Sequence, residues 1–365
     1  MRSRIKSGDP SKLVVIIDEA QFVAKRDASF MEAVAKLKKH KLYPGPVLII
    51  LATSSTVWAT QEAAEQFKGA EMKLESLNFL EVVRHFESLP VAEIVRIYGA
   101  IGGVPAYLDK WDAAKSFKDN ICRLVLTPSG ALYGEADAVI SAELRELSAY
   151  STILAAIARG ENKLNDIFHA TGFSRAKISV YLKNLATFNI VEKVVSFETG
   201  GWENAKKGVY QIKDTFVNFW FKFVYPNMSN LYLLSPEEFY DTYIEKELDA
   251  YLERYFREVC TEYLLILNQM GQLPFTIKRV GTWIGKTGRI DIVAQSEDRR
   301  SIIGFCNWDK PMMTMDMCEN MAMAMDQARL TSDDYYLFSA TDFEPALQSY
   351  VVRDPRFKLI NMNEL

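Results

Sequence analysis

Two unbroken apolar runs near the start of the chain predict buried parallel strands. LVVIID covers residues 13–18, and VLIILATSS covers residues 47–55. Continuous rather than alternating apolar residues are typical of strands that are covered on both faces, as in a parallel α/β sheet. Between the runs, FMEAVAKLKKHK at residues 30–41 carries apolar residues at helical spacing. The pattern therefore predicts a strand, a helix and a second strand in the first third of the chain.

A different pattern in the middle of the chain predicts three helices followed by a two-stranded ribbon. Residues 140–158 are amphipathic, residues 164–168 fit a short second helix, and Ser174 is a suitable N-cap for a third. IVEKVVSF and GVYQIK then read as alternating strands around the polar loop TGGWENAKKG. This order of elements predicts a winged helix-turn-helix over residues 138–213.

Two segments further along have unusual compositions. YQIKDTFVNFWFKFVYP, at residues 210–226, is densely aromatic, and its helix-like spacing favours a buried connector between domains over a base-stacking platform. MMTMDMCENMAMAM, at residues 312–325, holds seven of the thirteen methionines. We expect it to form a helix packed on a sheet, with an adaptable partner surface as the alternative.

Composition predicts a globular protein, and its cysteines and N-terminus lead us to expect it in the cytoplasm. Its 365 residues are 49% apolar and 25% charged with a net charge of -4, which fits two or three domains. The four cysteines form no CxxC pair, which argues against a zinc site and favours reduced thiols. The apolar run near Met1 is short and ends in carboxylates, so the sequence predicts neither a signal peptide nor a membrane span.

The two predicted strands end in residues with a specific chemical meaning. Asp18 and Glu19 stand where P-loop NTPases carry Walker B, in which the Asp holds Mg²⁺ and the Glu polarises the attacking water. The alternative is that these acids cap the next helix. Thr53, Ser54 and Ser55 stand where AAA-type ATPases carry sensor 1, so Ser54 and Ser55 are catalytic candidates with the two acids.

The phosphate-binding loop of such enzymes is missing from the sequence. GxxxxGK[ST] supplies backbone N–H groups and a lysine to the phosphates, and no such string occurs. Residues 285–287 have only the last three letters of the motif. We therefore do not expect this chain alone to hydrolyse ATP.

Several strings, in their order and spacing, resemble one family. VVIIDEAQ, LATSS, LNFLEVVRHF, IGGVPAYL and YQIKDTFVNFWFKFVYP resemble the archaeal-type AAA ATPases, a STAND-like group also frequent in bacteria, over residues 12–342. The resemblance implies ATP and Mg²⁺ as cofactors of the intact member, and a start truncated before the P-loop. It implies an α/β and α+β multidomain fold, with a partial P-loop NTPase parallel sheet (1–77), a helical lid (78–137), the winged helix (138–213), and a linker helix with a restriction-endonuclease-like α/β domain (214–365).

The predicted winged helix is mildly basic. Between Lys163 and Lys213 there are eight Lys/Arg against four Asp/Glu. Such an excess favours phosphate contact, and Asn and Arg side chains read base edges. A module that binds a protein partner is the alternative. The candidates for DNA contact are Arg175, Lys177, Ser179, Lys183, Asn184, Lys206 and Lys207.

The last domain resembles the PD-(D/E)xK nucleases but lacks most of their site. By the resemblance, Asp291 occupies the first acidic position and Glu258 lies on the preceding helix, whereas Phe305 and Asn307 replace the expected Glu and Lys. Phenylalanine cannot ligate Mg²⁺, so we expect the fold without its chemistry. Two alternatives stay open: a metal-dependent nuclease that uses Glu258, Asp291 and Glu262, and an interaction module or decayed gene product.

Overall fold

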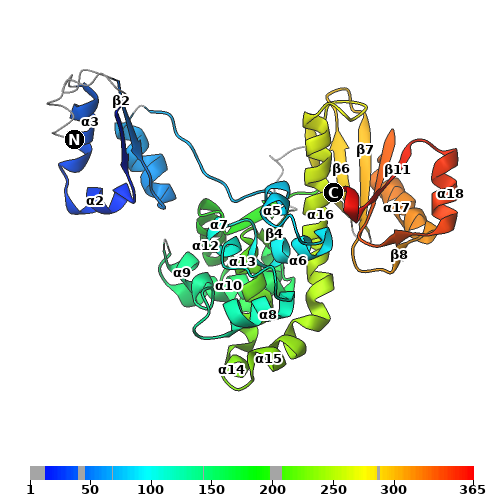
Figure 1. The fold of residues 1–365 in the computed structure, drawn as a ribbon, viewed down its shortest axis with the longest axis horizontal. Helices are drawn as coiled ribbons and strands as arrows, with labels where there is room; N and C mark the ends of the chain where they lie inside the picture. Colours follow the sequence, from blue (N-terminus) through cyan, green and yellow to red (C-terminus); the bar gives the residue numbers. More distant parts are fainter. Residues whose placement is uncertain (1–12, 40–45, 68, 143, 198–207, 286–287) are drawn as a thin grey trace. The chain divides into compact units, whose positions relative to one another are not determined.

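The computed structural model describes residues 13–39, 46–67, 69–142, 144–197, 208–285 and 288–365. It is a mixed α/β structure with many helices and several small sheets, and it divides into two compact units, Met1–Glu75 and Ser76–Leu365 (Figure 1). In the part of the chain that is described, no helix is both long and apolar enough to cross a membrane.

The first unit contains the predicted strand, helix and second strand. β1 (Leu13–Ile17) and β2 (Val47–Leu51) pair in parallel, in a register that matches their first and last residues. The helices of this unit are α2 (Ala20–Arg26), α3 (Phe30–Lys39), η1 (Trp58–Ala63) and α4 (Ala64–Gln66). Ala20, Met31 and Trp58 form its buried core, against which Ile17 and Leu51 pack.

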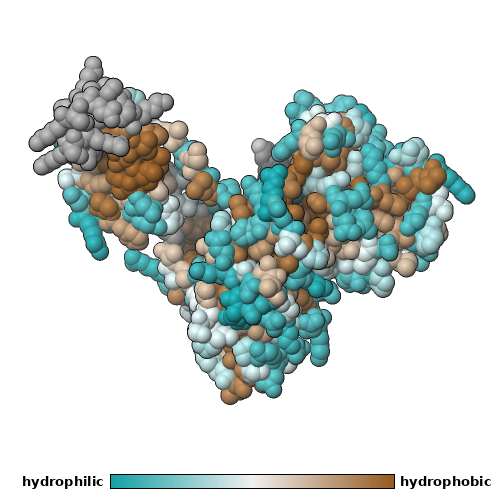
Figure 2. Space-filling model, viewed as in Figure 1, coloured by the Kyte–Doolittle hydropathy of each residue, from teal (hydrophilic) through white to brown (hydrophobic). Residues whose placement is uncertain are grey.

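The expectation that both faces of these strands are covered is wrong for the described residues. Val14 and Ile16 of β1 are 51% and 66% exposed, and Leu48 and Ile50 of β2 are 56% and 41% exposed. Successive side chains of a strand point to opposite faces, and the described helices cover only one face of this two-stranded sheet. Hydrophobic side chains consequently lie on the surface of the unit (Figure 2).

The second unit begins with short helices. They are α5 (Phe79–His85), α6 (Val91–Ile101), α7 (Pro105–Leu108), α8 (Phe117–Ile121), η2 (Cys122–Leu126) and α9 (Glu135–Ser141). A capping box starts α5, because the Asn78 side chain accepts from the Glu81 N–H and the Glu81 carboxylate accepts from the Asn78 N–H, both at 2.9 Å. Gly102, at φ 67°, ends α6 in a conformation that favours glycine.

Three helices and a ribbon follow, in the predicted order. They are α10 (Leu147–Arg159), α11 (Leu164–Thr171), α12 (Arg175–Thr187), β3 (Val191–Val194) and β4 (Val209–Ile212), and the two strands pair antiparallel. Ser174 caps α12 as predicted, since its Oγ accepts from the Lys177 N–H at 3.2 Å. The single helix predicted over residues 140–158 is wrong, because Glu146 adopts a left-handed backbone at φ 60° between α9 and α10.

The aromatic segment lies in the core, as predicted. Phe216, Phe219 and Trp220 are at most 2% exposed, so their rings are not available to stack on bases. The segment and the elements after it are α13 (Thr215–Phe219), η5 (Trp220–Val224), η6 (Tyr225–Asn227), α14 (Met228–Leu231), α15 (Pro236–Tyr243) and the long α16 (Glu245–Gln269).

A five-stranded mixed sheet ends the unit. Its order is β11 (Phe357–Asn361), β9 (Asp334–Ser339), β7 (Ser301–Asn307), β6 (Arg289–Gln295) and β5 (Arg279–Ile284). β11, β9 and β7 are parallel to one another, whereas β6 is antiparallel to both of its neighbours, β7 and β5. α16 packs on one face, and α17 (Met315–Ala328) and α18 (Pro345–Arg353) pack on the other (Figure 1). β8 (Met312–Met313) and β10 (Asp342–Phe343) form a short parallel pair.

The methionine-rich helix packs on this sheet as expected. Met321 and Met325 of α17 are 2% and 7% exposed and belong to the core beneath β6 and β7, whereas Met323 is 55% exposed. Most of the thioethers of α17 therefore fill space between the helix and the sheet.

Candidate functional site

The carboxyl ends of β1 and β2 carry a cluster of polar side chains, which we call the polar edge: Asp18, Glu19, Gln21, Thr53 and Ser54. Parallel strands in register end at the same edge of their sheet, so the residues after Ile17 and after Leu51 meet there. The Glu19 carboxylate accepts from the Ser54 Oγ at 2.9 Å and from the Ser54 N–H at 3.3 Å. This contact joins the Walker B candidate to a sensor 1 candidate.

Gln21 holds the polar edge together. Its Nε2 donates to Glu19 at 2.5 Å and to the Ser54 Oγ at 3.1 Å, and its Oε1 accepts from Thr53 at 2.7 Å. The residue is only 2% exposed, so these bonds fix its amide. Gln21 was not among the site residues predicted from the sequence. Its position two residues after Glu19 could have indicated a polar partner for that carboxylate.

The backbone at the polar edge disagrees with the helix-capping alternative for the two acids. Glu19 precedes α2 with φ 47° and ψ 45°, a left-handed conformation, and its side chain makes no cap hydrogen bond. The Asp18 Oδ1 instead accepts from the Glu19 N–H at 3.0 Å. A left-handed non-glycine residue costs about 1 kcal/mol or more, which the hydrogen bonds of the edge offset.

The two sensor 1 candidates differ in their surroundings. Ser54 contacts Glu19, whereas the Ser55 Oγ accepts from the Trp58 N–H at 3.3 Å and so supports the start of the next helical segment. Gln21, and then Ser54, donate to the Glu19 carboxylate and lower its pKa. The polar edge therefore presents an ionised carboxylate and a hydroxyl beside Asp18, and carboxylate oxygens are the ligands that Mg²⁺ prefers.

The lowered pKa of Glu19 gives a direct prediction. Gln21→Ala removes the largest stabilising hydrogen bond on the carboxylate, so the pKa of Glu19 should rise toward its usual value of about 4.3. Side-chain carboxyl NMR titration measures this change. Ser29→Ala, which removes the hydroxyl that donates to Asp27 in the same unit, is the matched control and should leave the pKa of Glu19 unchanged.

Among the predicted DNA-contacting residues of α12, Arg175 and Lys183 are the exposed cations. Lys183 is exposed and enters none of the ion pairs found among the described residues. The Arg175 guanidinium stacks 4.1 Å from the Phe168 ring and donates to Asn165 at 2.5 Å, while remaining exposed. These two contacts hold the Arg175 side chain at the start of α12.

Like Arg175, the other three α12 candidates make contacts within the protein. The Lys177 ammonium lies 4.4 Å from the Phe173 ring, the Ser179 Oγ donates to a backbone carbonyl one turn earlier at 2.9 Å, and Asn184 donates to the Tyr150 hydroxyl at 2.8 Å. The Asn184 amide is therefore committed to orienting the helix. Lys206 and Lys207 lie outside the described residues.

Asp291 lies on β6 among positive charges. Its carboxylate is 3.1 Å from the Arg289 Nε and 3.7 Å from the Arg257 Nε, and it accepts from the Cys306 N–H at 3.1 Å. Burial raises the pKa of this carboxyl, an effect that Arg257 partly opposes. Phe305 is partly buried and packs against the core, and Asn307 is buried and donates to Ser339 at 3.1 Å.

The other carboxylates of the nuclease alternative have different partners. Glu258 pairs with Arg254 at 2.8 Å, and Glu262 accepts from the backbone N–H groups of Phe79 and Leu80 at 3.0 and 3.1 Å. Glu262 thus serves the start of α5. Over the described ranges, no group of three or more His, Cys, Asp or Glu side chains is placed to hold a metal ion. The structure does not bring Glu258, Asp291 and Glu262 together.

A comparison with protein families matches only part of the chain to a family. The DUF234 family, described as archaeal and bacterial proteins of unknown function, matches residues 220–323. The matched part contains Asp291 but neither the polar edge nor α12. An uncharacterized protein of Methanocaldococcus jannaschii is 28% identical over 303 residues, which cover 81% of this chain and 67% of the relative. The chain is therefore similar to one archaeal protein without an assigned activity, and residues 220–323 are similar to a family of unknown function.

One solved structure resembles the chain only weakly. The crystal structure of a Vibrio cholerae protein aligns with 97% of this chain and 88% of its own chain, at 11% identity and a TM-score of 0.24. That score is too low to support an assignment of fold or function.

Proposed function

We propose that this chain is a nucleic-acid-binding protein built on the plan of the AAA-type ATPases, with α12 as the recognition helix of a winged helix. The supporting observation is the arrangement around α12. A short turn from α11 leads to the Ser174 cap, and an antiparallel ribbon follows the helix. Helix-turn-helix proteins present the second helix of this arrangement to the major groove.

The exposed surface of α12 suits a polyanion. Ile178, Leu182 and Leu185 are buried and anchor one side of the helix. The outward side carries Ser179, Val180 and Lys183, all exposed, and no acidic residue occurs within the helix. Lys183 and Arg175 supply phosphate contacts, and a small apolar side chain such as Val180 can contact a thymine methyl group.

The experiment is a fluorescence-anisotropy titration of a short DNA duplex at low salt. Arg175→Ala/Lys183→Ala should lower the affinity about tenfold or more, since each phosphate left without a cation weakens binding at every sequence. Lys110→Ala/Lys115→Ala removes two exposed cations from the segment between α7 and α8 and is the matched control. Equal affinities of the two double variants would exclude α12 as the contact, and binding of a protein partner would then be the better hypothesis.

A second candidate function is supported by the contact between Glu19 and Ser54. We propose that the polar edge is the Mg²⁺ and water side of a nucleotide site, with Asp18 as the metal ligand and Glu19 as the water-orienting carboxylate. Asp18 would hold Mg²⁺, Glu19 would orient a water molecule and the Ser54 hydroxyl would donate to the terminal phosphate, whose charge Mg²⁺ would neutralise. The phosphate-binding string is missing from the sequence, so we propose contact with a nucleotide rather than its hydrolysis.

This candidate predicts a dependence on Asp18. Asp18→Asn should lower the Mg²⁺-dependent affinity for a non-hydrolysable ATP analogue about tenfold, because an amide is a poorer ligand for a hard cation. Isothermal titration calorimetry with and without Mg²⁺ measures it, and Asp27→Asn, an exposed acid of the same unit, is the control. An affinity that changes with neither Mg²⁺ nor the Asp18 substitution would remove the polar edge from nucleotide binding.

A further inference from the structure

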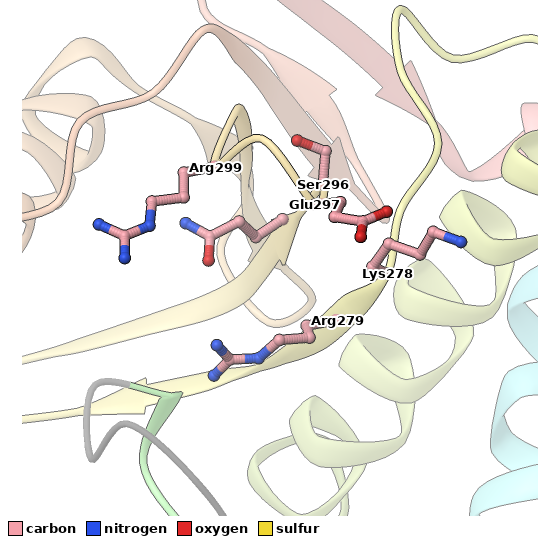
Figure 3. A pocket seen from close by; sticks show the side chains of 6 residues that line it. Lys278, Arg279, Ser296, Glu297 and Arg299 are labelled. Carbon is pink, nitrogen blue, oxygen red and sulfur yellow. The ribbon is translucent and has the colours of Figure 1, made fainter.

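A basic hollow lies at one end of the sheet in the second unit, away from the residues discussed so far. It has a volume of about 410 Å³ and is lined by Lys278, Arg279, Gln295, Ser296, Glu297 and Arg299. Lys278 immediately precedes β5 and Arg279 begins it, and the other four residues come from the end of β6 and the turn toward β7. Three cationic side chains and one carboxylate therefore line the hollow (Figure 3).

The side chains of the hollow are segregated by direction. Figure 3 shows the Arg279 and Arg299 side chains extending to one side, whereas Lys278 and the Glu297 carboxylate extend to the other. The two guanidinium groups thus share a side on which Glu297 does not lie. Ion pairs between the described residues include neither Arg279 nor Arg299. No carboxylate of the described residues is therefore in ion-pair contact with either guanidinium group.

The Arg279 side chain and the Arg299 backbone are both held by their surroundings. The Arg279 guanidinium lies 4.8 Å from the Phe197 ring. Arg299 has a left-handed backbone at φ 68° in a turn that is closed by the Ser296 N–H, which donates to the Arg300 carbonyl at 3.0 Å. A left-handed arginine is unfavourable by about 1 kcal/mol, and such strain often marks a functional position. The ring contact places the Arg279 guanidinium and the turn places the Arg299 backbone, so less conformational freedom is lost when the two arginines bind an anion.

We propose that Arg279 and Arg299 bind a phosphate group, and that this group belongs to the backbone of a nucleic acid. Guanidinium groups bind phosphate oxygens through pairs of parallel N–H···O bonds, and a Gln295 amide in the same hollow offers a further donor. Lys278, Arg279 and Arg299 are all exposed, so the hollow is open to solvent. An open hollow suits a phosphate on a large ligand better than a small molecule that needs enclosure.

The neighbourhood of the hollow favours nucleic acid as the source of the phosphate. Phe197, which stacks on Arg279, comes three residues after β3, and the neighbouring Ser196 Oγ accepts from the Ile284 N–H of β5 at 3.0 Å. The segment that follows β3 of the proposed winged helix therefore contacts β5, the strand whose first residue lines the hollow. This choice of source rests on the proposed nucleic-acid binding, whereas the phosphate site itself does not.

The test uses the full chain, a short DNA duplex and free pyrophosphate as two separate probes. Arg279→Gln/Arg299→Gln should weaken duplex binding about tenfold and reduce the slope of log affinity against log salt by about 1. The same variant should abolish any binding of pyrophosphate. Lys110→Gln/Lys115→Gln is the matched removal of two exposed cations and should do neither. Arg279→Lys/Arg299→Lys keeps the charge but not the paired N–H donors, and should recover only part of the affinity.

The outcomes separate this proposal from the role of α12. Loss of duplex affinity in the Arg279/Arg299 variant supports a backbone phosphate. Loss of pyrophosphate binding with unchanged duplex affinity supports the phosphate site but assigns it to a free ligand, whatever α12 does. A Gln variant that binds both probes as the wild type does, or a wild type that binds neither, would overturn the proposal. Unchanged thermal unfolding of the variants excludes a loss of folding as the cause.

Discussion

Gly103→Ala is expected to destabilise the second unit by about 3 kcal/mol or more, which is the upper range for overpacking. A Cβ on Gly103 would lie 1.8 Å from the Leu77 carbonyl oxygen and 2.7 Å from its carbon, and both atoms are backbone. The Leu77 N–H also donates to the Gly103 carbonyl at 2.8 Å, so the two segments cannot separate without breaking that bond. Urea unfolding followed by circular dichroism measures the destabilisation.

Gly134→Ala is the matched control for this prediction. Gly134 precedes α9 in the same unit, and a Cβ there would meet nothing within 4 Å. We expect a change within about 0.5 kcal/mol, as at other open surface positions. Equal stability of the two variants would contradict the close approach of residue 77 to the turn between α6 and α7.

Phe219→Ala is the second substitution with a large expected effect, about 3–5 kcal/mol of unfolding free energy. Phe219 is fully buried, and its ring lies 5.0 Å from that of Phe223 and 5.9 Å from that of Tyr251 on α16. The substitution removes the packing of these rings and leaves a cavity between the aromatic segment and α16. Thermal or urea unfolding measures the effect, and Leu233→Ala, at a residue that is 79% exposed, should cost little.

The same variant discriminates between the two interpretations of the aromatic segment. A buried connector predicts reduced stability with unchanged DNA affinity of the folded fraction. A base-stacking platform predicts weaker DNA binding at unchanged stability, since an exposed ring contributes about 1–3 kcal/mol per stacked base. A stable Phe219→Ala protein would therefore contradict the core position of this segment.

The sequence predicted the local elements well where periodicity or a cap defines them. The two apolar runs became β1 and β2, and Ser174 caps α12 because its hydroxyl meets a backbone N–H. The break before α10 was missed, because it depends on the left-handed backbone of Glu146, which side-chain pattern does not encode. An apolar run also cannot reveal how many neighbours a strand has, so the exposed face of β1 and β2 was not foreseen.

The candidate sites differ in how far the sequence could define them. Glu19 and Ser54 were predictable as neighbours, because residues that follow adjacent parallel strands meet at one edge. The role of Asn184 was not, since only the fold brings it to the Tyr150 hydroxyl. The hollow with Arg279 and Arg299 has no motif, because its residues come from two strands and a turn that pairing alone brings together.

The salt dependence of duplex DNA binding by the whole chain is the most direct test of the proposed nucleic-acid binding, because it measures the contacts between cations and phosphates. We predict binding at low salt that weakens as salt rises, with a slope that falls by about 1 for each contacting cation removed from α12. Arg175→Ala/Lys183→Ala should show this smaller slope, and the Lys110→Ala/Lys115→Ala control should keep the wild-type slope. A wild-type protein that does not bind duplex DNA at low salt would contradict the proposed function.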